Sequence, residues 1–600
     1  MSSGYILGIS RGHNAGVCLL KDGQIVFASE EERFTRHKYD GGPLATMMKV
    51  KEYTDKIDAI VVCHTTDLKD GPKIEYTGDN LYSGLARKMG LIDRKTDIHN
   101  HPQCIDVSNL HHKVHAACAF YRSGFDEAVA VVIDGAGSAM TGETIDGPVT
   151  LWEVESIYDC SYPDNIKTLY KHYGCRDPIV TAINPNTDGE RFGDTPGHTF
   201  TSVVSGHAGI TKVYEAVTQY CGFQAIEAGK TMGLFPYGAE NENIPPLFTK
   251  DTKIPLSDRT MIIPTYPNGA IVNHYNYDEL SASPTGDETD WTEYQNRRDL
   301  AYACQTQTQE QALDIILSAV KMSGKKKVVL SGGYGLNCVA NYWYLNRLNE
   351  EGIEMFVEPI SNDGGTAIGS ALLYYHSVEQ SELRRPREIY LGPQYNYTDD
   401  EINKLAQEYN AIVEDATDEK VIELMTNKNI VAMFQGRAEN GPRALGNRSL
   451  MFDPTFEDGK DFVNEIKRRE YFRPFAGSIL AEDAHEWFDL RGMEDSPHMM
   501  YAVNCQPGIA EKIPSIIHVD GTCRIQTVNE EENPLYYRVI KAFKEKTGVP
   551  IIFNTSFNLG GEPLVETLED ALWTLSESKI EYLYLPEYGK LLTVGNWKVA

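Results

Sequence analysis

Apolar runs that end in glycine-containing turns recur along the chain, and they predict a protein built from strands and helices. The first residues read as three short strands separated by turns: "YILGIS", "VCLL" and "QIVFASEE". The pattern returns at Ala128 with "AVAVVIDGAGSAMTG", and a third copy, "KKVVLSGGYGLNCVAN", leads into a helix-like stretch. Short buried runs of this kind, combined with helical patterns, are typical of α/β folds.

The first two copies lie about 120 residues apart, which is longer than the period of a solenoid repeat. We therefore expect two related α/β halves that enclose one nucleotide cleft. Glycines allow backbone N–H groups to approach phosphates closely, and helix N-termini add partial positive charge. Each turn alone would equally fit an ordinary β-turn, and the order of all three favours the cleft.

A second region is expected after the charged, proline-containing stretch "EQSELRRPREIYLGP". An amphipathic helix pattern, "EINKLAQEYN", and a buried-strand pattern, "KNIVAMFQG", follow it. A chain of 600 residues is too long for one hydrophobic core. The sequence therefore predicts an α/β protein with two domains, residues 1–383 and residues 384–600.

Composition narrows the classes of protein to consider. The formal net charge of −30 disfavours non-specific nucleic-acid binding, although a local basic pocket for a small anion remains compatible with it. The eleven cysteines contain no CxxC pair, which argues against a disulfide framework and a thiolate zinc site. Since no apolar run approaches the ~20 residues that span a bilayer, and no signal peptide is evident, we expect a cytoplasmic protein that does not bind membranes.

The histidine-rich stretch "NLHHKVHAACAFY" is a candidate metal site. In a helix, His111 and His115 are four residues apart and lie on one face, where they can share an ion. Asp134 and Asp363, each at a strand-to-turn corner, could complete the ligand set for iron or another divalent transition metal. Spacing alone leaves a second interpretation open, namely an ordinary helix with chance histidines.

Cations are concentrated in the second half of the chain. Arginine binds phosphate and carboxylate with two parallel hydrogen bonds, so this concentration predicts an anion pocket, with structural salt bridges as the alternative. The strand pattern "IIFNTSFNLGG" ends in polar residues, at the kind of edge where open α/β sheets bind ligands, or simply in a tight turn. The candidate residues are Arg443, Arg448, Lys467, Arg469, Arg473, Arg524, Asn554 and Ser556.

Together these motifs resemble the NodU/CmcH family of O-carbamoyltransferases over nearly the whole chain. The resemblance rests on "EEERFTRHKYD", "HHKVHAACAFYRSGFDEA", "GKTMGLFPYG", "SGGYGLNCVAN", "NGPRALGNRS", "REYFRPFAGSIL", "HVDGTCRIQTV" and "NTSFNLGGEPLV". It implies an N-terminal domain of the actin-like ATPase superfamily. The C-terminal domain would be similar to threonylcarbamoyl-adenylate synthase.

The resemblance also implies a reaction. Carbamoyl phosphate and ATP, with Mg²⁺, would form carbamoyl adenylate and pyrophosphate in the C-terminal domain. The N-terminal domain, holding Fe²⁺ or another divalent transition metal, would pass the carbamoyl group to an acceptor hydroxyl and release AMP. A homo-oligomer is compatible with this scheme.

Residue roles follow from the same resemblance. His111, His115, Asp134 and Asp363 would be the metal ligands, and the C-terminal candidates would bind carbamoyl phosphate and ATP. His13 would be the catalytic base, although Asn14 stands where the family usually has aspartate, and an amide carries no negative charge. The residues expected to bind nucleotide in the N-terminal domain are Lys38, Lys230, Gly332, Gly333, Asn337 and Asn341.

Other functions stay open at this point. The acceptor is either a sugar or other small natural product, or a hydroxymethylated pyrimidine, free or in DNA; nucleic acid would take part only as that acceptor. A fused enzyme of tRNA threonylcarbamoylation is the alternative within transferases. A non-enzymatic ATP-binding sensor is the alternative outside them, and it would leave the arginine-rich half unexplained.

Overall fold

A computed structural model provides the structure. It describes residues 4–65, 81–93, 104–144, 147–174, 182–188, 194, 198–205, 209–244, 246–248, 295–385 and 387–595. The chain forms two compact units. The first contains Met1–Glu31 and Tyr39–Arg387, and the second contains Glu32–Lys38 and Glu388–Ala600. The predicted domain start at residue 384 lies four residues before the second unit's main segment.

The first unit begins with a five-stranded sheet in the order β3-β2-β1-β4-β5. Its first three strands form an antiparallel meander, and β4 and β5 continue it in parallel with β1. The predicted strands "YILGIS", "VCLL" and "QIVFASEE" are these first three. The bounds are β1 Tyr5–Ser10, β2 Gly16–Lys21, β3 Gln24–Glu30, β4 Ala59–Cys63 and β5 Cys104–Asp106.

A second sheet of the first unit repeats this arrangement. Its order is β10-β11-β9-β8-β6-β12-β13, in which β9-β8-β6 is antiparallel and β12 and β13 run parallel to β6. This repetition confirms the two related α/β halves of an actin-like fold. The bounds are β6 Glu127–Ile133, β7 Ala139–Thr144, β8 Gly147–Ser161, β9 Asn165–Gly174, β10 Ala182–Asp188, β11 Thr199–Ser205, β12 Lys327–Ser331 and β13 Glu354–Val357.

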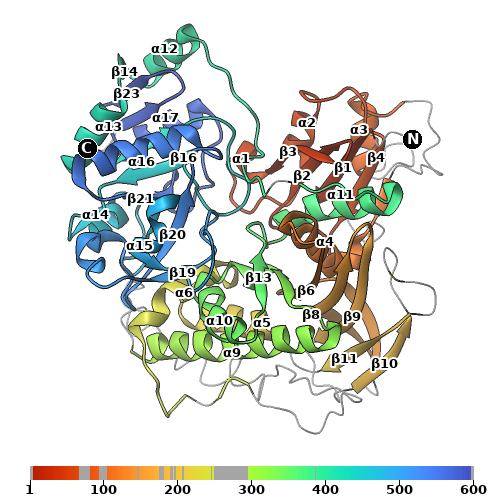
Figure 1. Cartoon of the computed structure of the whole chain (residues 1–600). Helices are drawn as coiled ribbons and strands as arrows, with labels where there is room; N and C mark the ends of the chain where they lie inside the picture. The colour runs from red at the N-terminus through yellow and green to blue at the C-terminus, as the bar shows by residue number, and fades with distance from the viewer. Residues whose placement is uncertain are drawn as a thin grey trace. The chain divides into compact units, whose positions relative to one another are not determined.

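Two helices lie between the sheets (Figure 1). Helix α4, His111–Ser123, follows the first sheet but packs on β6, β8 and β12 of the second. Helix α11, Gly364–Glu379, follows the second sheet but packs on β1, β2 and β4 of the first. Since the two helices also pack on each other, this exchange brings the ends of both halves together.

The remaining helices of the first unit cover the outer faces. The long α9 contacts β6 and β12 and also packs against α5, α6 and α10. The helix bounds are α2 Leu44–Val50, α3 Leu81–Lys88, α5 Gly209–Tyr220, α6 Ala228–Leu234, α9 Gln295–Ser323 and α10 Cys338–Glu350, with short 3₁₀ turns at η1 Ser108–Leu110, η2 Ala225–Glu227, η3 Phe235–Tyr237 and η5 Gly333–Leu336.

The second unit is built on one ten-stranded mixed sheet, in the order β14-β23-β22-β15-β16-β21-β17-β20-β19-β18. Its central strands are buried, as the pattern "KNIVAMFQG" predicts for β15. The bounds are β14 Ala411–Asp415, β15 Val431–Phe434, β16 Arg448–Phe452, β17 Ala476–Leu480, β18 Phe488–Asp489, β19 Ala502–Cys505, β20 Thr522–Val528, β21 Ile551–Ser556, β22 Tyr582–Leu585 and β23 Lys590–Val594.

Helices of the second unit cover this sheet. Helix α16 packs on β17 and β21 and against α13. The bounds are α12 Asp399–Glu408, α13 Asp418–Thr426, α14 Gly459–Ile466, α15 Ala484–Trp487, α16 Pro534–Thr547 and α17 Leu568–Ser576, with 3₁₀ turns η6 Ala481–Asp483, η7 Ala510–Lys512 and η8 Pro514–Ile516. Among the described residues of the whole chain, no helix combines the length and apolar character needed to cross a bilayer.

The segment Glu32–Lys38, which contains the short helix α1 (Glu32–Thr35), belongs to the second unit although first-unit residues flank it on both sides. Arg33 Nη2 donates to the carbonyl of Gly441 at 3.0 Å. Arg36 donates to the carbonyls of Leu564 at 2.6 Å and Pro563 at 3.0 Å. The N-terminal sequence therefore supplies part of the second unit.

Candidate functional sites

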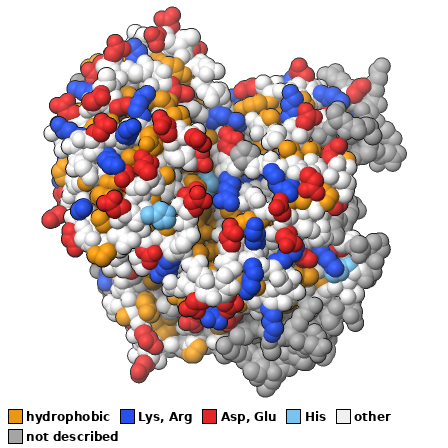
Figure 2. All heavy atoms as spheres, viewed as in Figure 1, with side chains coloured by type: hydrophobic (Ala, Val, Ile, Leu, Met, Phe, Trp, Pro, Cys, Tyr) orange, Lys and Arg blue, Asp and Glu red, His pale blue; other side chains and the backbone are white. Residues whose placement is uncertain are grey.

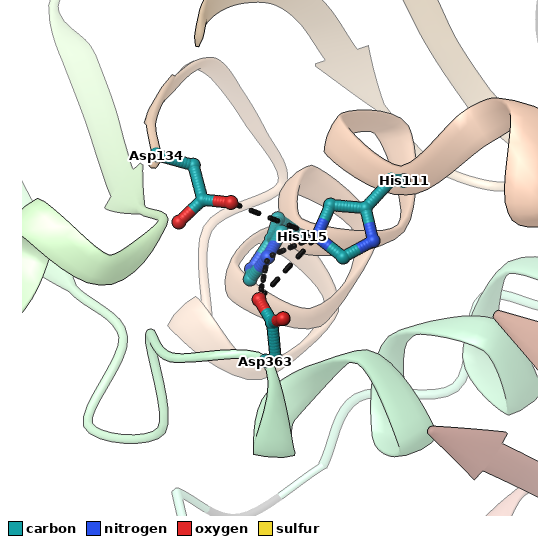
Figure 3. A group of neighbouring side chains, drawn as sticks. All are labelled: His111, His115, Asp134 and Asp363. Atoms are coloured by element: carbon teal, nitrogen blue, oxygen red, sulfur yellow. Dashed lines mark hydrogen bonds and ion pairs between the residues drawn. The ribbon is translucent and has the colours of Figure 1, made fainter. Parts of the chain in front are cut away.

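Four buried side chains of the first unit converge on one point. His111 and His115 come from the first turns of α4, Asp134 follows β6, and Asp363 precedes α11 (Figure 3). One ligand atom from each lies within 4.8 Å of the others. The two imidazole Nε2 atoms are 3.2 Å apart, and each lies 3.4 Å from Asp363 Oδ1. Asp134 Oδ2 lies 3.6 Å from His111 Nε2.

Local structure fixes the histidines. The N–H of His111, which has no partner within the helix, donates to Ser138 Oγ at 3.1 Å. His111 Nδ1 faces Cys63 Sγ at 3.7 Å, and His115 Nδ1 faces Ser331 Oγ at 3.4 Å. Both Nε2 atoms are therefore turned toward the carboxylates, as expected when neighbouring groups orient the ligand nitrogen of an imidazole.

Close helix packing brings Asp363 to the histidines. A Cβ atom at Gly369 of α11 would lie 2.1 Å from the carbonyl oxygen of Val114, so only glycine permits this approach to α4. Asp363 occupies the N-cap position of α11, yet its side chain makes no capping hydrogen bond. An N-cap aspartate ordinarily accepts hydrogen bonds from backbone N–H groups of the first turn. The Asp363 carboxylate faces the histidines instead, which indicates that it belongs to the cluster.

The electrostatics of the cluster favour a cation. Burial opposes the charge of His111, but the Asp363 carboxylate beside it raises the pKa of this imidazole well above its ordinary value. Burial would raise the pKa of Asp363, but His111 holds it well below its ordinary value. Two carboxylates buried with two imidazoles leave a net negative charge once the imidazoles are neutral.

These residues fit a divalent transition metal. Ligands at about 2.1 Å from a tetrahedral ion lie about 3.4 Å apart, and four separations of 3.2–3.6 Å are close to this value, in a cluster whose ligand atoms all lie within 4.8 Å of one another. Two imidazoles with two carboxylates suit iron, manganese or zinc rather than magnesium or calcium. Asp134 Oδ1 accepts from the N–H of Gly333 at 2.9 Å, so a residue that is not itself a candidate ligand orients this carboxylate.

His13 lies beside the cluster. Its Nδ1 is 3.9 Å from Asp363 Oδ2, and its side chain is 51% exposed, so a substrate can reach it. Asn14 is buried, and its backbone carbonyl accepts from Ser10 Oγ at 3.1 Å. Asp363 thus supplies the carboxylate partner that Asn14 cannot. His64, a residue that the sequence analysis missed, is influenced by both His13 and His111; burial and Arg11 lower its pKa to about 4.

The glycine-rich loop after β12 has the predicted form, but the side chains of Asn337 and Asn341 form hydrogen bonds within the protein. Gly332 adopts a left-handed φ of 88°, which positions Gly333 against Asp134. Asn337 caps α10 by accepting from Ala340 N, and it also exchanges hydrogen bonds with Gln305. Asn341 is fully buried and donates to the carbonyl of Gly335. Both asparagine side chains therefore stabilise the conformation of the loop through hydrogen bonds to the protein.

The two lysines predicted for the nucleotide site lie in different units. Lys230 lies in α6 of the first unit, where it pairs with Glu227 at 2.9 Å; Met232 of the same helix contacts Cys338 at the start of α10. Lys38 belongs instead to the second unit. Its charge there helps to lower the pKa of Lys467, so its assignment to the N-terminal domain is wrong.

The second unit gathers cations at one edge of its sheet. Lys467 Nζ, which is fully buried, donates to the carbonyl of Ser556 and to Asn558 Oδ1 at 3.2 Å. Arg469 Nη2 donates to Ser556 Oγ at 3.1 Å. Arg524 lies in β20, two strands from β21, which ends at Ser556. The structure thus brings predicted residues from three separate sequence stretches to one edge of the sheet.

This cation cluster is electrostatically unfavourable by itself. Burial, with the charges of Arg469 and Arg473, lowers the pKa of Lys467 well below its ordinary value. Burial, followed by the charge of Arg473, lowers the pKa of Arg469 to about 9. Buried like charges of this kind are stabilised by a bound polyanion, since phosphate oxygens accept from several cations at once.

The structure gives Arg448 a role other than the predicted anion binding. Its guanidinium is fully buried and stacks 3.8 Å from the centre of the Phe434 ring. Its donors bond to backbone carbonyls of Gln435, Gly436, Asn447 and Glu566. All five N–H groups are used, so Arg448 holds the loop between β15 and β16 and has no donor for phosphate. The same loop carries Arg443, which is half-buried.

Asn558 and Arg36 are further residues that the sequence analysis did not select. Asn558 is the shared partner of Lys467 and Arg469, and its position just after a strand and before two glycines was a usable signal. Arg36 holds the loop that follows Asn558, through the carbonyls of Pro563 and Leu564. No local pattern distinguishes Arg36 from a surface arginine.

The fold defines a two-unit α/β protein whose first unit carries a candidate metal site, and comparison with known proteins identifies its family. The model of the carbamoyltransferase N-terminus matches residues 75–372, and that of the carbamoyltransferase C-terminus matches residues 422–590. The chain belongs to the carbamoyltransferase family, and it is an enzyme.

Relatives extend over both units. A Synechocystis protein described as uncharacterized is 30% identical over 97% of this chain and 96% of its own length. The nodulation protein NolNO of Sinorhizobium fredii is 28% identical over 96% of this chain and 78% of its own. A 3′-hydroxymethylcephem-O-carbamoyltransferase from Amycolatopsis lactamdurans is 32% identical over 40% of this chain and 44% of its own. The resemblance to O-carbamoyltransferases is thereby confirmed.

Proposed function

We propose that the protein is an ATP-dependent O-carbamoyltransferase that uses its two units for two successive reactions. The buried cation cluster of Lys467 and Arg469 carries this proposal, because it is prepared for a phosphorylated substrate. Membership of the carbamoyltransferase family supplies the group that is transferred.

The second unit would form carbamoyl adenylate. Carbamoyl phosphate first loses its phosphate to water, and an oxygen of the resulting carbamate then attacks the α-phosphorus of ATP, which releases pyrophosphate. Orthophosphate and pyrophosphate therefore leave in equal amounts. Lys467, Arg469 and Arg524 would hold phosphate oxygens, and Mg²⁺ would accompany ATP. AMP is a good leaving group, so this step activates the carbamoyl carbon for transfer.

The first unit would transfer the group. His13 accepts the proton of the acceptor hydroxyl, whose oxygen attacks the carbamoyl carbon, and the bond to AMP breaks. Asp363 stabilises the resulting imidazolium. His111, His115, Asp134 and Asp363 would hold Fe²⁺ or a similar ion, which supplies electrostatic stabilisation of phosphate charge. The loop at Gly332 and Gly333, with Lys230, would face the nucleotide.

The acceptor would be a hydroxyl on a small molecule or on a hydroxymethylated pyrimidine. The name of the Amycolatopsis relative specifies a hydroxymethyl group as acceptor, and both of these classes can present one. On the face drawn in Figure 2, acidic and basic side chains of the described residues are intermixed, without a broad basic area. This face gives no support to long DNA, and a free nucleoside or nucleotide fits the net charge of −30 better.

The test is pyrophosphate release from ATP, Mg²⁺ and carbamoyl phosphate without an acceptor. We expect pyrophosphate and orthophosphate in equal amounts from the wild-type enzyme and neither product from Arg469→Ala. A requirement for threonine and bicarbonate in place of carbamoyl phosphate would identify a threonylcarbamoyl enzyme instead. Nucleotide binding without turnover under all these conditions would identify a sensor and overturn the proposal.

A further inference from the structure

A buried acceptor in the second unit has no partner among the described residues. This atom is Oδ1 of Asn554, in β21, and the residue is 1% exposed. A buried polar atom without a hydrogen bond costs about 1–3 kcal/mol, so such atoms are rare in folded proteins. An acceptor left open in this way points to a ligand that donates.

Neighbouring groups fix which end of the Asn554 amide is open. Its Nδ2 lies 3.2 Å from the carbonyl oxygen of Ala444, and a carbonyl oxygen can only accept. Nδ2 also lies 2.9 Å from Ser478 Oγ and 3.4 Å from Gln526 Oε1. Gln526 is oriented in turn by donating from Nε2 to the carbonyl of Leu445 at 2.9 Å. Nδ2 of Asn554 therefore faces these protein acceptors, and Oδ1 points in the opposite direction, away from them.

Strand register places this acceptor beside the cation cluster. Ala476 of β17 is paired with Asn554 on one side and with Arg524 on the other, so all three side chains lie on one face of the sheet. Asn554 and Arg524 are two strands apart, about 10 Å, with only a methyl group between them. Ser556, two residues after Asn554, lies on the same face and binds Arg469.

Two arginines near Asn554 hold open donors: Arg524 on the same face of the sheet, and Arg469, which is bound to Ser556. Nε of Arg469 and Nε of Arg524 are buried and have no partner among the described residues. This part of the sheet thus combines one open acceptor with open cationic donors. It fits a molecule that carries an N–H donor at one end and anionic or carbonyl oxygens at the other.

We propose that Asn554 Oδ1 accepts a hydrogen bond from the amino group of the carbamoyl substrate and makes the site selective for carbamoyl over acetyl phosphates. Ser478, Gln526 and the carbonyl of Ala444 are positioning groups that hold the amide in this orientation. The inference rests on the proposed function, because it concerns the substrate of the same site. Asn554 acquires a specific role, recognition of –NH₂, where the family resemblance implied binding of carbamoyl phosphate or ATP without naming the group recognised.

Two stable probes of equal shape test this role. Phosphonoacetamide carries the –NH₂ group, and acetonylphosphonate carries a methyl group in its place. Calorimetric titration of the full-length protein should show about tenfold tighter binding of the amide, the effect of one hydrogen bond to a buried acceptor. Equal affinity of the wild-type protein for the two probes overturns the inference, whatever its enzymatic activity.

Variants locate the effect. Asn554→Leu should lose the preference for the amide but retain its affinity for acetonylphosphonate, and Asn554→Ser, which is smaller, serves if the leucine variant does not fold. Thr555→Val is the matched control, since its side chain lies on the opposite face of the same strand; it should keep the preference. A preference that survives in both Asn554 variants contradicts the role of this residue.

The inference and the proposed function fail separately. Amide preference without pyrophosphate release would retain the subsite and reject the proposed reaction. Pyrophosphate release without amide preference would retain the reaction and reject the subsite.

Discussion

The His–Asp cluster of the first unit (His111, His115, Asp134 and Asp363) and the cation cluster of the second are opposite in charge, and they differ in how far neighbouring groups balance that charge. In the first, two acids and two imidazoles meet within 4.8 Å, and the charge of Asp363 raises the pKa of the His111 imidazole beside it. In the second, cations are buried together, and the pKa values of Lys467 and Arg469 are lowered. We propose that the first site holds a cation permanently and that the second receives a polyanion.

We interpret this difference as a difference in how long each site would keep its ligand bound. Permanent ligands are matched by a compact set of groups that neighbouring residues orient, as Ser138, Cys63 and Gly333 do here. A transient anionic substrate needs a site that is less stable when empty, because substrate must also leave. The two reactions proposed for the enzyme therefore predict separable losses of function.

The largest expected effect separates the two sites. Asp363→Asn removes a charge that both histidines and His13 share, so carbamoyl transfer to acceptor should fall on the order of a thousandfold. Bound metal, measured by elemental analysis, should fall in parallel. Pyrophosphate release without acceptor should stay within about twofold of wild type, because the adenylate-forming residues lie in the other unit.

Asp126→Asn is the control, since this exposed aspartate pairs with Arg384 on the surface of the same unit. It should leave both reactions unchanged. Loss of pyrophosphate release in Asp363→Asn, with the protein still folded, would contradict the division of labour between the units.

Lys467→Met is expected to give the reverse result. Pyrophosphate release should fall about a hundredfold, while transfer from added carbamoyl adenylate is retained. Because the variant removes a buried, repelled charge, the free energy of unfolding without ligand should rise by about 1 kcal/mol. Thermal denaturation with and without pyrophosphate measures both effects: the variant should be more stable when empty and gain less from the anion.

The sequence predicted the members of the metal-binding cluster correctly as neighbours. A helical i, i+4 pair and two strand-end aspartates are local patterns, and the repeated sheet brings them together. His13 was named from the family resemblance alone, and its partner was not predicted: the chain offered Asn14, and Asp363 reaches His13 from a distant segment. Local patterns give the residues, and tertiary packing decides their partners.

The cation cluster was harder to predict, since arginines serve several purposes. Arg448 and Arg469 look alike in sequence, yet Arg448 binds backbone carbonyls with all its donors, and Arg469 retains a buried Nε that has no partner among the described residues. Burial and loop geometry decide between these roles. The exchange of Glu32–Lys38 into the second unit could not be predicted either, because nothing in its composition marks it as part of another core.

Arg36→Met tests this exchanged segment. The arginine holds the carbonyls of Pro563 and Leu564, in the loop where Glu562 O accepts from Asn558 Nδ2 at 2.6 Å. Freeing the loop should raise the KM for carbamoyl phosphate about tenfold in pyrophosphate release, with kcat changed less. Arg36→Lys should recover part of the loss, and Lys579→Met, which removes an exposed pair with Glu465 in the same unit, should have no effect. A fall in kcat alone would indicate a general disturbance of the unit.

The smallest expected effect is on the pH dependence of anion binding. In the empty protein the pKa of Arg469 is about 9, and a bound anion raises it, so binding takes up a proton above that pH. The affinity for sulfate, which remains a dianion throughout this range, should then fall about fourfold between pH 8 and 9.5, and further if Lys467 also titrates. Arg469→Gln should flatten this part of the profile. By contrast, metal binding by the His–Asp cluster must displace protons from His111, so its affinity should rise with pH. Opposite slopes, measured by calorimetry on one protein, would show that the two clusters differ in charge in the way their structures indicate; parallel slopes would contradict it.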